Sequence, residues 1–282
     1  MDGTYLTRPT VVSHLRAVWA IAVKDCISFL RYPLNAAFRA IEPAVWLTPV
    51  FFLGKTFGSG GQSGFAAVSG TSDYMAFIVL GAVLSNFVSA VFWGMGFGMK
   101  NEMSAGTLEN NWMAPIPRWL YLVGQTLASL IITTFTSASM LVLARLLFGV
   151  RITGDVLAAI TAIVPMLVAL YGFGFAFGAV VLLMRDANTM VDVTNFVVML
   201  FSGSFFPVQV LPRFFFPFAL ALPLTYGYDA VRGHLLGTHT LMPIPYETLI
   251  LALFMVVMVP LGYAIFRRID RKCRVEGTLW MH

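Results

Sequence analysis

Apolar runs of about 20 residues, the length of a membrane-spanning helix, recur along the whole chain and restrict the folds open to it. Only 11% of the residues are charged and 59% are hydrophobic, whereas soluble domains usually carry about 25% charged residues. A soluble chain of this composition would expose large apolar patches. The sequence therefore predicts an all-α integral membrane protein. The six predicted spans are 36–57, 73–98, 119–147, 155–184, 188–206 and 247–266.

Residues 12–32, before the first predicted span, have a different pattern. Apolar residues recur on one face at helical spacing, but Lys24 and Asp25 lie near the middle of the segment. Central charges make a spanning helix costly, so the pattern favours a helix in the membrane interface, ended by Pro33. A first spanning helix is the competing interpretation. The apolar face consists of Leu15, Val18, Trp19, Ala22, Cys26, Phe29 and Leu30.

The positions of Lys and Arg predict the orientation of the chain. Cytoplasmic loops of membrane proteins carry an excess of these residues. Most of the 18 Lys and Arg residues fall on the cytoplasmic side when the N-terminus is placed there. We therefore expect both termini in the cytoplasm. The two cysteines, Cys26 and Cys273, then lie in a reducing compartment, and no disulfide is expected.

The polar loop 100–118 joins the second and third predicted spans on the cytoplasmic side. Gly106 interrupts the preceding helix, Thr107 can begin a short new helix, and Glu109 suits its N-terminal end. A short helix that projects from the bundle would offer a binding surface to a separate motor protein. An ordinary polar turn is the competing interpretation. The residues assigned to this contact are Glu102, Gly106, Thr107, Leu108, Glu109, Trp112 and Met113.

Residues 207–245 are apolar but repeatedly interrupted by proline, which disfavours one continuous helix. Broken helices at membrane depth require shielding by protein or a cavity, so we expect short re-entrant helices on the outer side. A poorly formed spanning helix is the competing interpretation, and it would make the number of spans odd. The residues assigned to an outer gate are Pro212, Pro223, Tyr226, Asp229 and Arg232.

Four polar residues fall within the predicted spans. Arg39 and Glu42 are three residues apart and can pair on one helix face. Asp192 and Asn195 share a face of the fifth span. They could touch substrate, join helices or reach the headgroups. A structural role is favoured, because Arg39, Glu42 and Asp192 lie near predicted inner ends where charges reach the interface.

Sequence signals for chemistry are missing. Gly54-Lys55-Thr56 resembles the end of a phosphate-binding loop, but Pro49 stands where that loop needs glycine. The four histidines lack metal-ligand spacing, and no catalytic constellation is evident. We therefore expect a protein that is not an enzyme, with no cofactor, no metal and no nucleic-acid partner.

Two stretches resemble motifs of the type-2 ABC transporter permeases, the membrane subunits of bacterial ABC exporters. The first is the loop 102–117, with its Gly-Thr-Leu-Glu core and terminal proline. The second is Pro223-Leu224-Thr225-Tyr226 followed by Asp229, Arg232 and Gly237, preceded by Leu211-Pro212. Leu222 departs from the pattern, since many members have Asn there, and Arg213 replaces a common second proline.

The resemblance covers essentially the whole chain and implies one transmembrane domain over 1–282 in a bacterial cell membrane. It implies a coupling helix that docks on an ATPase subunit, which binds ATP and Mg²⁺. It also implies a homodimer, or a heterodimer with a sister permease, bound to two ATPase subunits. We expect export of a hydrophobic or amphipathic substrate such as a drug, antibiotic or lipid. The alternatives are an exporter of lipid-linked polysaccharide, an ion-coupled secondary transporter and a membrane enzyme; the last two lack their expected signals.

Overall fold

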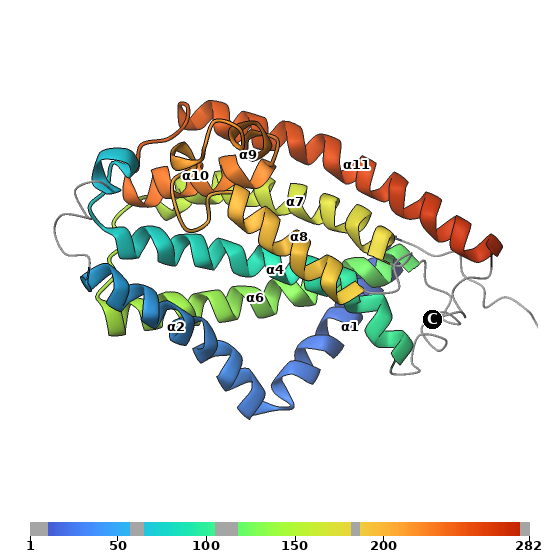
Figure 1. The fold of residues 1–282 in the computed structure, drawn as a ribbon. Helices are drawn as coiled ribbons and strands as arrows, with labels where there is room; N and C mark the ends of the chain where they lie inside the picture. Colours follow the sequence, from blue (N-terminus) through green and yellow to red (C-terminus); the bar gives the residue numbers. More distant parts are fainter. Residues whose placement is uncertain (1–10, 57–64, 105–117, 182–186, 277–282) are drawn as a thin grey trace, which may run out of the picture.

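The computed structural model describes residues 11–56, 65–104, 118–181 and 187–276. Every regular element in these residues is a helix (Figure 1). The all-α prediction is therefore confirmed for this part of the chain. The longer helices are α1 (Val11–Leu30), α2 (Pro33–Thr56), α4 (Tyr74–Ser104), α6 (Arg118–Phe148), α7 (Val156–Val181), α8 (Ala187–Phe201) and α11 (Ile244–Glu276).

Four of these helices are long and apolar enough to cross a membrane. The candidate spans are Tyr74–Met95, Val123–Phe148, Val156–Val181 and Ile244–Ile269. The two remaining predicted spans coincide with α2, which contains Arg39 and Glu42, and with α8. Helix α8 has only 15 residues and ends at Phe201 instead of 206, because Gly203 turns the chain with a positive φ of 73°. The count of six spans stays a prediction.

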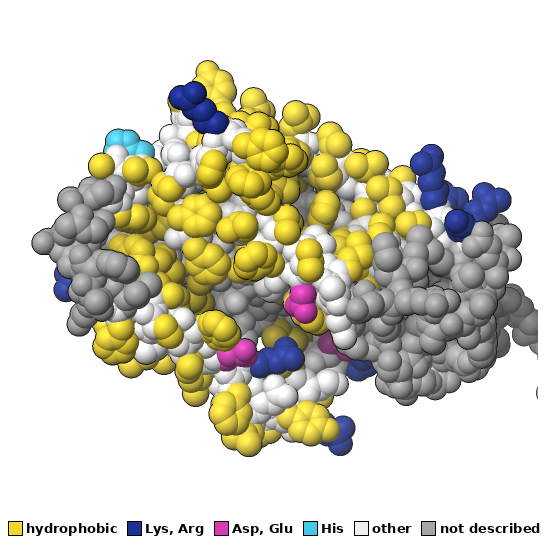
Figure 2. Space-filling model, in the orientation of Figure 1, with side chains coloured by type: hydrophobic (Ala, Val, Ile, Leu, Met, Phe, Trp, Pro, Cys, Tyr) yellow, Lys and Arg dark blue, Asp and Glu magenta, His cyan; other side chains and the backbone are white. Residues whose placement is uncertain are grey.

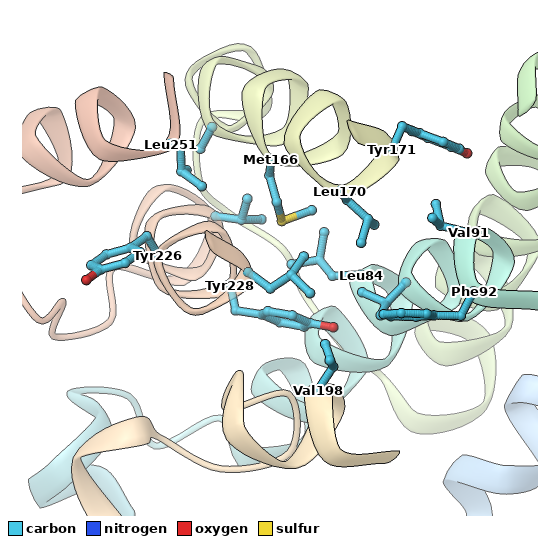
Figure 3. Packing of buried hydrophobic residues seen from close by; sticks show 14 of the residues in the cluster. Leu84, Val91, Phe92, Met166, Leu170, Tyr171, Val198, Tyr226, Tyr228 and Leu251 are labelled. Atoms are coloured by element: carbon cyan, nitrogen blue, oxygen red, sulfur yellow. The ribbon is translucent and has the colours of Figure 1, made fainter. Parts of the chain in front are cut away.

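Helix α7 lies at the centre of the bundle and packs on α4 and α11 (Figure 1). The main apolar core lies between α4, α7, α8 and α10 (Pro223–Leu236) (Figure 3). Phe92 and Leu84 of α4 face Met166 and Leu170 of α7 there, all four buried. Helices α1 and α2 form a V at one side of this bundle. The side chains of the core therefore come from helices that are far apart in the sequence.

Helix α1 matches the predicted amphipathic segment, with one correction. The helix ends at Leu30, and Pro33 begins α2 instead of ending α1. Proline favours the first turn of a helix, where its missing N–H is not needed. Ala22 is buried and the helix packs on α6, whereas Trp19 remains 61% exposed. Part of the predicted apolar face is therefore free to contact lipid.

We expect Gly262→Ala to destabilise the bundle. A Cβ at Gly262 would clash with the carbonyl oxygen of Gly172, so α11 would have to move away from α7. Overpacking of this kind costs about 1–3 kcal/mol, and a lower melting temperature of the purified protein would report it. Gly94→Ala is the matched control, because its Cβ would meet only Ser129 Oγ at 3.6 Å. Equal melting temperatures for the two variants would contradict the assigned α7–α11 contact.

Candidate functional site

Residues 202–243 form a chain of short helices beside the first turns of α4 and α11 (Figure 1). They are the 3-10 helix η1 (Val208–Val210), α9 (Phe216–Leu220) and α10 (Pro223–Leu236). Pro223 occupies the first turn of α10, and Gly237 ends α10 with a left-handed φ of 63°. The interruption that the prolines predict is therefore present. The depth of these helices in the membrane stays a prediction.

Arg232 of α10 is buried, with an exposed fraction of 3%, and binds three backbone carbonyls. Its Nε donates to Phe77 O at 3.3 Å, its Nη1 to Gly203 O at 2.7 Å, and its Nη2 to Ser204 O. The guanidinium also lies 3.6 Å from the centre of the Phe77 ring. Hydrogen bonds and the ring offset the cost of burying the charge. We call Arg232, Phe77, Gly203 and Ser204 the Arg232 cluster.

Hydroxyl groups of α10 fix it to its neighbours. Thr225 Oγ1 donates to Ala219 O at 2.6 Å, and the Tyr226 hydroxyl donates to Leu220 O at 2.9 Å. Tyr228 is buried, and its hydroxyl lies 2.8 Å from Ser85 Oγ of α4. The residues of the Pro-Leu-Thr-Tyr motif therefore join α10 to the end of α9, and the next turn joins it to α4.

Asp229 lies on α10 beside the segment that leads into α11. Its Oδ2 accepts a hydrogen bond from the Leu241 amide at 2.6 Å. Burial raises the pKa of the Asp229 carboxyl, and the Leu241 amide opposes that rise. Its neighbour Glu247 is fully buried in the first turn of α11 and accepts from the Met242 amide at 3.3 Å. Glu247 is not among the site residues predicted from the sequence. Its local signal is an acidic residue at the start of an apolar helix.

The predicted gate residues are therefore only partly together. Tyr226, Asp229 and Arg232 share α10, and Pro223 starts this helix. Pro212 lies in an exposed turn, where its carbonyl accepts from Phe215 N at 2.9 Å. No contact of Pro212 with α10 is described.

The four intramembrane polar residues fall into two groups. Asn195 Nδ2 donates to Ser89 Oγ at 3.2 Å and joins α8 to α4, which fits the structural interpretation. Arg39, Glu42 and Asp192 are exposed, and the ion pairs described for the chain do not include them. Figure 2 shows acidic and basic side chains near one another between α2 and α8, with hydrophobic side chains beside them.

The predicted coupling contact cannot be placed. Glu102 lies in the last turn of α4, but its side chain is outside the described residues. The rest of the contact, Gly106, Thr107, Leu108, Glu109, Trp112 and Met113, lies in 105–117 and is also outside them. The coupling role of this loop stays a prediction. Among the described residues, no group of three or more His, Cys, Asp or Glu side chains could bind a metal ion.

We expect Arg232→Lys to destabilise the protein although the charge is kept. A lysine ammonium cannot reproduce the fork that binds three carbonyls, and each buried carbonyl left without a donor costs about 1–3 kcal/mol. The measurement is the melting temperature and the amount of protein recovered from membranes. Arg213→Lys is the control, since Arg213 is exposed in the same region. A wild-type melting temperature for Arg232→Lys would contradict the importance of the three bonds.

A comparison with known families finds one that fits this architecture. The model of the ABC-2 type transporter family matches residues 16–236, from the second turn of α1 to the end of α10. No curated protein matches the chain. Members of this family generally work with an ABC ATPase, and the matched domain is the transmembrane component rather than the ATPase. The chain is a multi-pass membrane permease that belongs to the ABC-2 type transporter family.

Proposed function

We propose that this chain is the permease subunit of an ATP-driven exporter, in the inner membrane of a bacterium. It would move a hydrophobic or amphipathic substrate from the cytoplasmic side outward. The family match over 16–236 is the observation that carries the proposal. The sequence contains no GxxxxGK[ST] motif, so a separate ATPase would supply the energy.

The proposed assembly contains two permease copies and two ATPase subunits. Loop 100–118, with Glu102 and Glu109, is the proposed docking site of the ATPase. This loop joins α4 to α6, and these two helices pack on each other. A displacement of the loop would therefore act on both helices together.

Helix α4 offers a route from this loop to the proposed outer gate. It ends at Ser104, and its first turns lie at the other end of the bundle. There the Phe77 carbonyl binds Arg232, and Ser85 contacts Tyr228. A movement of α4 along or about its axis would therefore act on α10. The motor must favour one arrangement of these helices through differential contacts for this route to operate.

The exposed surface of α2 and α8 carries both charged and hydrophobic side chains, and this mixture favours an amphipathic substrate. On α2, Arg39 and Glu42 are exposed beside Phe38 and Trp46, which are 65% and 75% exposed. On α8, Asp192 is exposed on the same helix as Phe196. Charges that face lipid are costly, so we assign this mixed surface to the substrate path or to the second permease copy.

The decisive test of coupling uses the permease together with its ATPase in lipid vesicles. We expect a panel of drugs and lipids to contain a class that stimulates ATP hydrolysis. Glu109→Ala and Glu102→Ala should reduce this stimulation, and transport, at least several-fold without changing membrane insertion. Both changes remove a carboxylate from the proposed docking surface.

Asp155→Asn is the matched control for this test. Asp155 Oδ1 accepts from the amides of Leu157 and Ala158 at the start of α7, and asparagine serves as well in that position. This variant should keep normal stimulation. Normal transport by both glutamate variants would contradict the assigned docking site. Absence of any complex with an ATPase would contradict the proposed function as a whole.

A further inference from the structure

Two carboxyl groups meet where α10 is joined to α11. Asp229 of α10 and Glu247 of α11 accept hydrogen bonds from adjacent amides, those of Leu241 and Met242. The amides that they bind belong to successive residues, so the two carboxyl groups lie close together. The connecting segment therefore places two acidic side chains from different helices side by side.

The Oε2 atom of Glu247 is buried and lacks a described hydrogen-bond donor. Glu247 as a whole is fully buried. An ionised carboxylate without a partner is costly in such a place, and two adjacent carboxylates disfavour each other's charge. A protonated Oε2 removes both costs, because its O–H donates to Asp229.

The neighbouring charged and titratable groups do not remove the need for this proton. Arg232 is the cation that acts on Asp229, but its Nε, Nη1 and Nη2 all donate to backbone carbonyls. Tyr226 of α10 is the other titratable group affected by Glu247. His239 is the histidine of the segment that connects α10 to α11, and its backbone N–H donates to Ser69 O. Three other helices pack on α10, and the groups with which they contact it do not ionise. They are Ser85 and Phe77 of α4, Met166 of α7, and the backbone carbonyls of Ala219 and Leu220 in α9.

We propose that Asp229 and Glu247 form a proton-binding site that joins α10 to α11 when it is occupied. The proton lies between Glu247 Oε2 and the Asp229 carboxylate, while the remaining oxygens accept from the Leu241 and Met242 amides. Asp229 is only half-buried, and it gives the site a connection to water. This inference depends on the local geometry and is independent of the proposed transport function.

The sign of the pH dependence follows from the retained proton. In the unfolded chain both carboxyl groups lose their protons at about pH 4. Above that pH the folded protein binds more protons than the unfolded chain, so its stability falls as the pH rises. The stabilisation is complete below about pH 4 and is lost as the folded pair releases its proton. In that window the folding equilibrium changes about tenfold per pH unit.

The test is the melting temperature of the purified full-length protein in lipid nanodiscs between about pH 6 and about pH 9. We expect the wild type to lose stability towards the alkaline end. Glu247→Gln should flatten this dependence and melt above the wild type at the highest pH, because its amide can donate to Asp229 without a proton. Asp155→Asn, which also removes a carboxyl group but at the exposed start of α7, should retain the wild-type slope.

Equal slopes for the wild type and Glu247→Gln would overturn the proposal. So would a large rise in the alkaline melting temperature on adding calcium, because the site would then bind a cation. If Glu247→Gln does not fold, Asp229→Asn should flatten the slope in the same way. Infrared spectroscopy of the wild type provides a further readout. A protonated carboxyl band present at neutral pH and lost at alkaline pH supports the site, and its absence at neutral pH excludes it.

Discussion

The guanidinium of Arg232 donates hydrogen bonds to backbone carbonyls in the turn that follows α8. Gly203 and Ser204 lie in the turn just after α8, and Arg232 donates to the carbonyls of both. Irregular backbone at membrane depth requires such partners, since unsatisfied polar groups cost several kcal/mol there. The same side chain binds Phe77 O of α4. One cation thus permits the chain to leave the regular helices and return through α10.

Small residues give this cation and the long helices the space they need. A Cβ at Gly81 of α4 would clash with Ser204 O and with the Arg232 guanidinium, so glycine there lets the turn approach α4. Gly172 and Gly262 similarly bring the backbones of α7 and α11 together. In a lipid environment, where apolar side chains gain little by leaving the solvent, close backbone packing contributes much of the association. The glycines and the Arg232 cluster therefore stabilise one arrangement.

The sequence predicted the elements better than it predicted their contacts. Apolar runs located the long helices, and prolines located the breaks between α8 and α11, because both signals act within a few residues. The early end of α8 was missed, since it depends on the turn at Gly203 that Arg232 stabilises from 29 residues away. The Phe77–Arg232 contact spans 155 residues and left no periodic signal. Glu247 was missed for the same reason, because its significance depends on Asp229.

Two of the polar connections between α10 and the rest of the bundle differ in their chemistry. Arg232 joins it to α4 and to the turn at 203–204 through bonds from a cation that stays charged. Asp229 and Glu247 join it to α11 through a contact that needs a proton. If α4 moves relative to α11, α10 must leave one of them. Separation of the carboxyl pair leaves no buried cation without its hydrogen-bond partners, and water can solvate the two carboxyl groups once they separate. The carboxyl pair is therefore the connection that can be lost. An outward opening would therefore separate α10 from α11 and leave it attached to α4.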